Sequence, residues 1–544
     1  MSTEIEKLKI NSNALRGTIK QSLNNPITSR LATGDDQLIK FHGIYQQDNR
    51  DRREAREKIR LEPDHSFMLR IRIPAGIVTS KQLIAINDIS DSYGEKHYKC
   101  TTRQTIQIHH IAKQNLPSVI SHLHLAGLDS KATCGDVNRN ITTASHTLKP
   151  ALLQECLVMA QELSDAFLPT SQAYEDLFLG NNTTTMVPDA MYQDRYLPRK
   201  FKTAIAIPPI NDCDLFTNDL GFIVNGEKEI ESITLVLGGG LGHTFGNVKT
   251  FPKLGTPIGN FPKKHLPAVM KAVLEFQRDF GNRNDRKLSR LKHTIAELGL
   301  EFTKKELEKI SSITFDPPIF QAFTTGQECF GWNIDENGKS RYTLKLPSGR
   351  VSDQLFPYKS FIRQVASELQ VDWKITSFQN LHITAPDDKN KDLLKALIKH
   401  FRLDTQHKSE FSKELFGCTS FPQCPLAFAE AERIIPNLEH TIEALLLKHN
   451  LLDLQISMRV SGCPNSCARP ELAEIGLIGK SKSRYNLYLG ADRAGTRMNF
   501  LFQESVTLED IYKQLDSLFH QYSVNKNHQE YFGDFCHRTI QCNN

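Results

Sequence analysis

A repeated pattern of strands and turns is the feature that most limits the folds open to this chain. Residues 70–76 read Arg-Ile-Arg-Ile-Pro-Ala-Gly, and residues 343–349 read Thr-Leu-Lys-Leu-Pro-Ser-Gly. A second similar pair occupies residues 98–108 and 373–383. The offset between matching residues is 273 in the first pair and 275 in the second. Two matches at nearly one offset predict two copies of a unit of about 270 residues.

The order of patterns within each copy indicates the class of fold. Each copy begins with a strand that ends in a Pro-x-Gly turn, passes through a helix-like stretch and reaches a second strand. Longer stretches follow, with a strand pattern at 232–237 and helical patterns at 265–276 and 439–449. Thr507 can cap a further helix together with Asp510. We predict an α+β fold with two pseudo-twofold-related halves, each a small β-rich unit plus a larger α/β unit.

The domain limits are expected where these patterns change. We expect an N-terminal arm over 1–63, small β-rich units over 64–130 and 321–405, and larger α/β units over 131–320 and 406–544. Within the arm, residues 49–60 carry many charges of both signs. The favoured interpretation of that run is a solvated helix or arm, and a surface that docks a partner is the alternative.

Composition excludes several classes of protein. The chain has 544 residues, 39% of them hydrophobic and 24% charged, which excludes a disordered, collagen-like or coiled-coil chain. At about 150 residues per domain, this length corresponds to roughly three to four domains. The net charge of +5 is too small for a dedicated nucleic-acid binder. We see no run of about 18 apolar residues and no secretory signal, so we expect a cytoplasmic protein without a membrane span.

Four of the 11 cysteines lie close together and are the first indication of a chemical site. Their spacing, C-x5-C-x38-C-x3-C, is formed by Cys418, Cys424, Cys463 and Cys467. Four thiolates can bind a [4Fe–4S] cube or a zinc ion, but five residues between the first two fit zinc poorly. An iron–sulfur cluster is the favoured interpretation, with zinc and unrelated buried cysteines as open alternatives. The other seven cysteines are expected to be ordinary thiols, because a disulfide framework is not typical of a chain without an export signal.

The residues after Cys424 predict how one of these thiolates is stabilised. Pro425 precedes a run of strong helix formers at 426–433, so we expect a helix that begins at this proline. Cys424 would then lie near the helix N-terminus, where backbone N–H groups favour a thiolate. Pro464 follows Cys463 in the same way.

Basic side chains share faces of several predicted strands. Because side chains alternate along a strand, Lys200 and Lys202 lie on the face opposite Phe201, Thr203 and Ile205. The other basic or polar residues on or beside such faces are Arg70, Arg72, Arg103, Gln107, His109 and Arg139. Each could be a solvated face by itself. Several of them in one half, with a metal-type cysteine cluster in the other, favour a shared anionic ligand.

A glycine-rich loop at 238–246 does not predict a nucleotide site. It follows a strand but does not satisfy G-x-G-x-x-G, and no convincing acidic residue lies about 20 positions further on. We therefore expect no nicotinamide or flavin domain. A redox protein of this kind must receive its electrons from another protein.

The motifs at 418–427 and 461–467 resemble the paired cluster and sirohaem signature of the sulfite/nitrite reductase family. The resemblance extends over nearly the whole chain and includes residues 40–48, 134–140 and 197–202. Within the family, the N-terminal segment and residues 483–490 are most similar to the haemoprotein (beta) subunits of the assimilatory, NADPH-dependent type. The resemblance implies two ferredoxin-like half-domains and two larger sirohaem-binding units. The chain departs from the family pattern at Cys536-His537.

The resemblance also implies roles for individual residues. It implies a sirohaem whose iron shares the Cys467 thiolate with a [4Fe–4S] cube, and Cys418, Cys424 and Cys463 as the other ligands of the cube. Four positions match residues that contact the macrocycle, namely Arg103, Gln107, His109 and Arg199. Four more match residues around the substrate, namely Arg70, Arg139, Lys200 and Lys202.

The implied reaction is the six-electron reduction of sulfite to sulfide, as part of sulfate assimilation and cysteine biosynthesis. Related nitrite reductases usually have asparagine at the position of Lys202, so this lysine favours sulfite over nitrite as the substrate. The implied partner is a separate FMN/FAD flavoprotein (alpha) subunit in a hetero-oligomer, with no nucleic acid or membrane involved. A nitrite reductase is one alternative, and a metal-cluster binding protein without catalysis is another.

Overall fold

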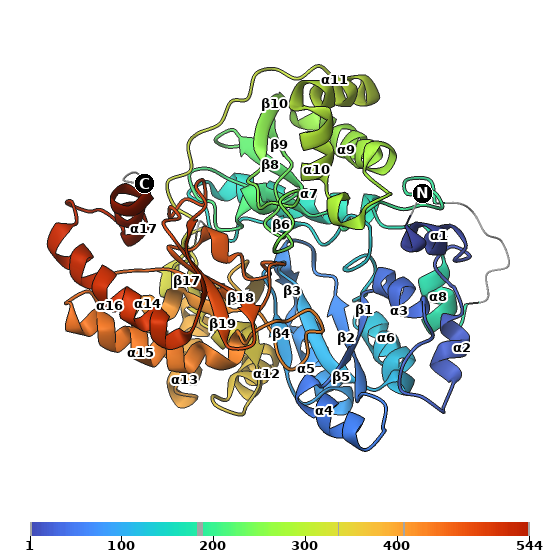
Figure 1. The fold of residues 1–544 in the computed structure, drawn as a ribbon, viewed down its shortest axis with the longest axis horizontal. Coiled ribbons are helices and arrows are strands. Elements are labelled where there is room, and N and C mark those ends of the chain that lie inside the picture. The colour runs from blue at the N-terminus through green and yellow to red at the C-terminus, as the bar shows by residue number, and fades with distance from the viewer. Residues whose placement is uncertain (1–2, 182–188, 336, 406–407, 542–544) are drawn as a thin grey trace.

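The computed structural model describes residues 3–181, 189–335, 337–405 and 408–541, and its strands form four five-stranded sheets. Figure 1 shows elements of the first half, coloured blue to green, on the right and at the top, and elements of the second half, coloured yellow to red, on the left. Two of the sheets belong to the small β-rich units, are antiparallel and are here called the small sheets. The other two contain parallel and antiparallel pairs and are here called the larger sheets. The α+β architecture of two related halves is confirmed.

The first small sheet has the strand order β1-β2-β5-β4-β13. Its strands are β1 (Ile44–Asp48), β2 (His65–Ile71), β4 (Tyr98–Cys100), β5 (Ile106–Ile111) and β13 (Arg350–Val351). Phe67, Leu69 and Ile71 of β2 are fully buried, whereas Arg70 is half-buried, as the alternation predicts. β1 lies within the stretch expected to be an arm and nevertheless pairs with β2 along its whole length.

The second small sheet repeats this order as β11-β12-β15-β14-β3. Its strands are β3 (Ile77–Val78), β11 (Gly331–Ile334), β12 (Ser340–Leu344), β14 (Asp372–Ile375) and β15 (Leu381–Ala385). The residues that match in the sequence therefore occupy matching strands, since β2 corresponds to β12 and β5 to β15. The internal repeat is confirmed as a structural repeat.

The two small sheets exchange their last strands. β3 of the first half pairs with β14, and β13 of the second half pairs with β4. Each exchanged strand follows a Pro-x-Gly turn in which the glycine has a positive φ, 76° at Gly76 and 78° at Gly349. A Cβ on Gly76 would lie 2.3 Å from the carbonyl oxygen of Ile375, and one on Gly349 would lie 2.2 Å from that of Cys100. Only glycine allows the two backbones to approach this closely.

The larger sheets also repeat each other. The first has the order β10-β9-β8-β7-β6, with β6 (Thr142–Thr143), β7 (Thr203–Ala206), β8 (Leu220–Asn225), β9 (Ser232–Leu237) and β10 (Thr256–Pro262). The second has the order β16-β17-β18-β19-β20, with β16 (Leu415–Gly417), β17 (Met458–Ser461), β18 (Ile475–Ser481), β19 (Arg484–Leu489) and β20 (Phe500–Val506). The pairings along β6-β7-β8 and along β16-β17-β18 are parallel, and those along β8-β9-β10 and along β18-β19-β20 are antiparallel.

Helices cover these sheets and flank the halves (Figure 1). Those of the first half are α1 (Glu4–Ile10), α2 (Ile19–Asn24), α3 (Asp35–Leu38), α4 (Arg50–Lys58), α5 (Ser80–Tyr93), α6 (Leu116–Leu125), α7 (Pro150–Ala166), α8 (Ala173–Phe178), α9 (Leu266–Phe280), α10 (Leu291–Leu298) and α11 (Leu300–Ser311). Those of the second half are α12 (Tyr358–Glu368), α13 (Asp388–His400), α14 (Glu410–Glu414), α15 (Ile435–Lys448), α16 (Leu508–Asn525) and α17 (Phe532–Cys536). Among the described residues, no helix is long and apolar enough to cross a bilayer.

Most of the predicted regular elements are present, and one is not. The strand at 232–237 is β9, the two helical patterns are α9 and α15, and Thr507 and Asp510 form a capping box at the start of α16. The predicted helix from Pro425 is wrong. Residues 425–431 form turns and bends, in which Ala427, Ala429 and Ala431 are buried while Leu426 and Phe428 are exposed. The amides of Phe428 and Ala429 both donate to the carbonyl oxygen of Gly462, so the local helix propensity yields to tertiary contacts.

The charged run at 49–60 forms α4, which has no buried residue, so a solvated helix is confirmed. Its first residue still contacts the second half. The guanidinium of Arg50 lies 4.4 Å from the centre of the Phe421 ring and donates to the carbonyl oxygen of Ala427 at 2.7 Å. α4 therefore lies beside the loop that carries Cys424.

Candidate active site

Parallel strand pairing brings the two cysteine motifs together. Cys418 follows β16 and Cys463 follows β17, and these neighbouring parallel strands end at the same edge of their sheet. The amide of Cys418 donates to the carbonyl oxygen of Val460 at 3.0 Å, and the amide of Gly462 donates to the Cys418 sulfur at 3.3 Å. The motifs 45 residues apart in sequence therefore meet at one place.

The four thiols affect one another electrostatically. Burial raises the pKa of Cys418, Cys424 and Cys463, to about 12 for Cys424, and neighbouring cysteine sulfurs raise each pKa further. Thiols in such a site become thiolates when a metal centre supplies positive charge. In the described part of the chain, no group of three or more His, Cys, Asp or Glu side chains is arranged to hold a single metal ion.

Cys467 differs from the other three because its side chain is exposed. Contacts with the first half fix its backbone. The hydroxyl of Thr102 donates to the carbonyl oxygen of Cys467 at 3.1 Å, and Arg469 donates to the carbonyl oxygen of Thr102 at 3.2 Å. Arg469 also pairs with Asp214 at 2.6 Å. Cys467 thus lies at the boundary between the halves.

Three neighbouring basic residues of the first half have side chains with no counter-ion among the described residues. They are Arg199, Lys200 and Lys202, which lie directly before β7, and the side chains of all three are half-buried. Within the described ranges, none of the three side chains forms an ion pair or a hydrogen bond. Burial, together with Arg199 and Arg290, lowers the pKa of Lys200 to about 7, whereas the Cys467 thiol opposes that shift. Burial and Lys200 hold the pKa of Lys202 well below its usual value. Such a cation set fits an anionic ligand.

Two further predicted cations meet at one carbonyl group. Arg70 and Arg139 each donate to the carbonyl oxygen of Thr133 at 3.3 Å. Arg70 also approaches the sulfur of Cys134 at 3.3 Å. The side-chain amide oxygen of Gln107 accepts from Arg70 Nη2 at 2.6 Å. The structure therefore brings Arg70, Gln107 and Arg139 together, and it adds Cys134, which the sequence analysis treated as an ordinary thiol.

His109 and Arg103 have buried donors that remain available. His109 lies on β5 and contacts the Gln47 amide oxygen through Nδ1 at 3.0 Å, while its Nε2 is buried without a hydrogen-bond partner. The prediction that Arg103 lies on a strand face is wrong, because Arg103 lies in the turn before β5. Its terminal nitrogens donate to Asn218 and to the carbonyl oxygen of Thr203, and its Nε has no partner.

Arg72 shares the face of Arg70 but belongs to a different site. Its guanidinium pairs with Asp129 at 2.8 Å and with Asp165 at 2.6 Å, so its charge is already balanced. Neither acid is near Arg72 in the sequence, and the strand pattern alone could not reveal this pairing. Arg72 is therefore a structural residue.

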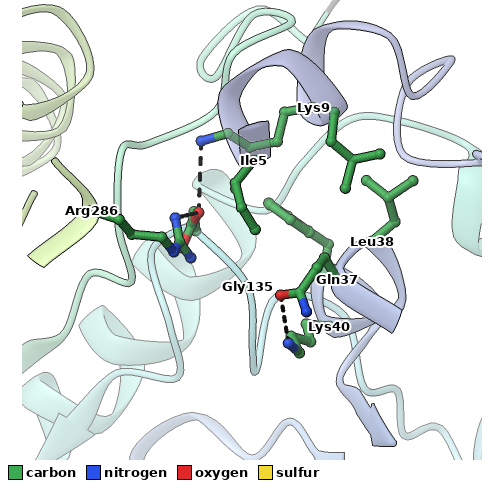
Figure 2. Close-up of a pocket in the computed structure, with 10 residues that line it drawn as sticks. Ile5, Lys9, Gln37, Leu38, Lys40, Gly135 and Arg286 are labelled. Atoms are coloured by element: carbon green, nitrogen blue, oxygen red, sulfur yellow. Dashed lines mark hydrogen bonds and ion pairs between the residues drawn. The ribbon is translucent and has the colours of Figure 1, made fainter. Parts of the chain in front are cut away.

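Asp136 is a buried acid that holds the loop carrying Arg139 in place. Arg286 binds its carboxylate through two nitrogens at 2.8 and 3.0 Å, and Lys9 of α1 lies 3.6 Å away (Figure 2). Its backbone carbonyl accepts from the amide of Leu197 at 3.0 Å, which joins the loop carrying Arg139 to the segment carrying Arg199 and Lys200. The adjoining pocket of about 20 Å³ has room for little more than a water molecule.

We predict that Lys9→Met destabilises the protein by about 1–3 kcal/mol, because Lys9 is 1% exposed and its loss leaves the Leu197 carbonyl and Glu6 with fewer partners. Urea unfolding measures this change. Lys7→Met, an exposed lysine of the same helix, is the matched control. Equal unfolding midpoints for the two variants would contradict the role given to Lys9.

The glycine-rich loop proves to be part of the boundary between the halves. The amide of His243 donates to the carbonyl oxygen of Pro464 at 2.9 Å, and Lys292 donates to the carbonyl oxygens of Gly240 and Gly242 at 2.8 Å. A Cβ on Gly239 would lie 2.1 Å from the carbonyl oxygen of Phe216. The loop thus packs on the second cysteine motif.

Several residues that organise this site could not be identified from the sequence. Asp214 pairs with Arg459 at 2.8 Å and with Arg469 at 2.6 Å, and so holds both ends of the second cysteine motif. Asp136 lies in the motif at 134–140 that resembles the family, but only Arg139 of that motif was predicted to be a site residue. The one sequence signal for Arg469 is its position two residues after Cys467. No sequence signal identifies Asp214.

Comparisons with known proteins find two family models and a solved structure that match this chain. The ferredoxin-like half domain of nitrite/sulfite reductases matches residues 60–126, and the nitrite and sulphite reductase 4Fe-4S domain matches residues 159–314. The four cysteines lie beyond both matches. The structure of the Mycobacterium tuberculosis NirA protein shares the fold, with a TM-score of 0.79, 23% identity, and coverage of 99% of this chain and 96% of that chain.

Two curated relatives are similar over almost the whole chain. The sulfite reductase [NADPH] hemoprotein beta-component of Leptospira biflexa is 41% identical over 543 residues, which are 98% of each protein. The protein of the same name from Shewanella oneidensis is 41% identical over 539 residues, which are 97% of this chain and 95% of the relative. At this identity and coverage, the chain belongs to the nitrite and sulfite reductase family.

Proposed function

We propose that this chain is the haemoprotein (beta) subunit of an assimilatory NADPH-dependent sulfite reductase, which reduces sulfite to sulfide. The observation that carries the proposal is the group of cations Arg199, Lys200 and Lys202, whose side chains have no counter-ion in the described chain. They belong to a chain whose two cysteine motifs meet and whose relatives are named sulfite reductases. Sulfur passes from +4 in sulfite to −2 in sulfide, so the reaction consumes six electrons.

The family's 4Fe-4S domain and the hemoprotein relatives support sirohaem and a [4Fe–4S] cluster as the cofactors. We propose that Cys418, Cys424, Cys463 and Cys467 hold the cube, with Cys467 shared with the sirohaem iron. The exposed thiol of Cys467 is accessible for this role. When bound, the coupled cofactors supply electrons to the substrate one at a time.

The protein atoms fit a carboxylate-rich macrocycle. Sirohaem carries eight carboxylates, and the proposed contacts are Arg103, Gln107, His109 and Arg199. Among these, Arg199 has a guanidinium without a counter-ion in the described chain, and the buried donors Arg103 Nε and His109 Nε2 have no partner. Unpaired buried donors of this kind are costly unless a ligand satisfies them.

We assign the remaining cations to the substrate. The guanidinium groups of Arg70 and Arg139 suit the oxygens of sulfite because each carries several donors. In this structure, Nε and Nη2 of Arg139 donate to the carbonyl oxygen of Gly135 at 3.0 and 2.7 Å, so sulfite would have to replace that partner. Lys200 and Lys202 hold protons in a strongly positive environment, so they release them more readily than isolated lysines do. We propose that they deliver protons to the oxygens as the S–O bonds break, so that oxygen leaves as water.

The electrons reach this chain from a second protein. The sequence carries no motif that predicts a nucleotide domain, while the relatives are named as NADPH enzymes and as beta-components. We therefore propose an FMN/FAD flavoprotein (alpha) subunit as the donor, in a hetero-oligomer. We also propose a cytoplasmic location, because the ten described cysteines are all free thiols, as in a reducing compartment.

A visible spectrum and a dye assay test the proposal. The purified protein should show a Soret band with red-shifted tetrapyrrole absorption and should contain iron and acid-labile sulfide. With a reduced dye as the electron source, sulfite should be reduced to sulfide at a higher kcat/KM than nitrite is reduced to ammonia. A colourless zinc protein would refute the proposal, and a preference for nitrite would favour the nitrite reductase alternative.

A further inference from the structure

A row of polar side chains crosses the first small sheet on the face of the proposed substrate and cofactor contacts. The strand register places Arg70 of β2 opposite Gln107 of β5, and Gln107 opposite Lys99 of β4. Arg350, on the exchanged strand β13, lies opposite Lys99. Directly opposite residues share one face of a sheet. Lys99 and Arg350 therefore continue the row of Arg70 and Gln107 towards the second half.

Lys99 and Arg350 share one carboxylate, that of Glu432. The ammonium group of Lys99 donates to Glu432 Oε2 at 2.6 Å, and Arg350 donates to both carboxylate oxygens, to Oε2 at 3.1 Å. In the described chain, neither cation forms an ion pair with a second acid. The side chain of Lys99 is 2% exposed and that of Glu432 is 12% exposed. These three residues, here named the Glu432 triad, thus keep a net positive charge that is mostly buried.

Backbone hydrogen bonds join the Glu432 triad to the first cysteine motif. The amide of Glu432 donates to the carbonyl oxygen of Cys418 at 3.1 Å. Ser348, in the turn before Arg350, accepts at 3.0 Å from the amide of Gly417, the residue before Cys418. Burial lowers the pKa of Lys99, and both Glu432 and the Cys418 sulfur oppose that shift. The buried positive charge therefore lies close to a proposed ligand of the cube.

The uneven number of charges points to a role beyond support of the fold. One cation would balance Glu432, and a buried charge without a counter-ion is costly. A cube held by four thiolates is an anion, and its reduction adds one more negative charge. We propose that the Glu432 triad raises the reduction potential of the [4Fe–4S] cube, so that Lys99 and Arg350 set how readily the cube accepts an electron. This inference rests on the proposed function.

Coulomb's law gives the size of the expected effect. At an effective dielectric constant of about 20, a unit charge about 10 Å away changes the equilibrium constant for adding one electron by roughly 10- to 20-fold. For a one-electron couple, a 10-fold change corresponds to about 59 mV. Replacing either cation by a neutral residue removes the net positive charge, while the other cation remains as the partner of Glu432. The carboxylate is therefore not left unpaired in either variant.

Redox titrations of the full chain with its cofactors, followed by visible absorption and EPR, test this proposal. Lys99→Met and Arg350→Gln each remove one cation, and Lys99→Arg keeps the charge. Lys96→Met, at an exposed lysine three residues before Lys99, is the matched control. We expect Lys99→Met and Arg350→Gln to lower the midpoint potential of the cube by at least about 59 mV, a 10-fold shift. Lys99→Arg and Lys96→Met should keep the wild-type potential, because the first preserves the charge and solvent screens the exposed charge lost in the second.

Three results would overturn the proposal. The wild type, Lys99→Met and Arg350→Gln could have equal potentials, or Lys99→Arg could lower the potential as far as Lys99→Met does, which would make shape rather than charge the cause. Loss of iron and acid-labile sulfide from both Lys99→Met and Arg350→Gln would make the triad a support of the Cys418 loop instead. Failure of the proposed function appears separately, in the wild type: a preference for nitrite over sulfite leaves the expected potentials in place, whereas a protein without iron and acid-labile sulfide contradicts both proposals.

Discussion

Replacing Cys467 by serine is expected to abolish sulfite reduction and to remove the tetrapyrrole bands from the visible spectrum. Cys467 is the exposed thiol of the four and lies where the two halves meet, held by Thr102 and by Arg469. Loss of a residue that only supports a metal ligand typically costs about 10–100-fold in affinity or activity. Loss of the ligand proposed to join two cofactors should cost more.

The measurement combines the spectrum, the iron and acid-labile sulfide content, and turnover with reduced methyl viologen. Cys329→Ser, at another exposed cysteine, is the matched control and should retain all of them. If the Cys467→Ser protein kept the wild-type spectrum and turnover, the assignment of Cys467 as the shared ligand would be wrong.

Replacing Lys202 by asparagine is expected to lower the turnover of sulfite by about 10²–10⁴-fold, the usual contribution of a positioned proton donor. The substitution removes a proton and one of the unpaired charges that face the anion, while the backbone amide of Lys202 keeps its 2.9 Å hydrogen bond to Asp219. Lys200→Gln should act in the same direction. Nitrite reduction should fall less, because related nitrite reductases usually have asparagine at this position.

Steady-state assays with both substrates and a reduced dye measure this effect. Lys249→Gln changes an exposed lysine in the loop at 243–250 and controls for loss of charge alone. An intact spectrum in Lys202→Asn shows that the cofactors are bound. Unchanged sulfite turnover in such a protein would remove Lys202 from the mechanism.

The strands and the pairing of the halves could be predicted because they depend on local patterns. Alternation along 67–73 identified the buried face of β2, since Phe67, Leu69 and Ile71 are all 0% exposed. The Pro-x-Gly turns could be found because Gly76 and Gly349 are required by close backbone contacts. The exchange of β3 and β13 could not be predicted, because two-residue strands carry no pattern and their partners are more than 200 residues away.

The errors have the same physical origin. Residues 426–433 have helix-forming side chains, but the backbone amides of Phe428 and Ala429 bind Gly462 instead of forming helical hydrogen bonds. Arg72 matched Arg70 in pattern, yet Asp129 and Asp165 neutralise it. Whether a basic residue is free to bind an anion depends on acids distant in sequence, such as Asp136 and Asp214, and no local rule supplies them. The residue roles at the site stay predictions until the variants are measured.

The exchanged strands also set the order of events on the ribosome. β4 obtains its outer neighbour when Arg350 pairs with Lys99, and these residues are 251 positions apart in the chain. At about 5–20 residues per second, the edge of β4 stays open for about 13–50 s after it has been synthesised. An open edge of this kind is a template for pairing with other chains. We therefore expect each half, when it is expressed alone, to lack one edge strand of its small sheet and to expose that edge to other chains.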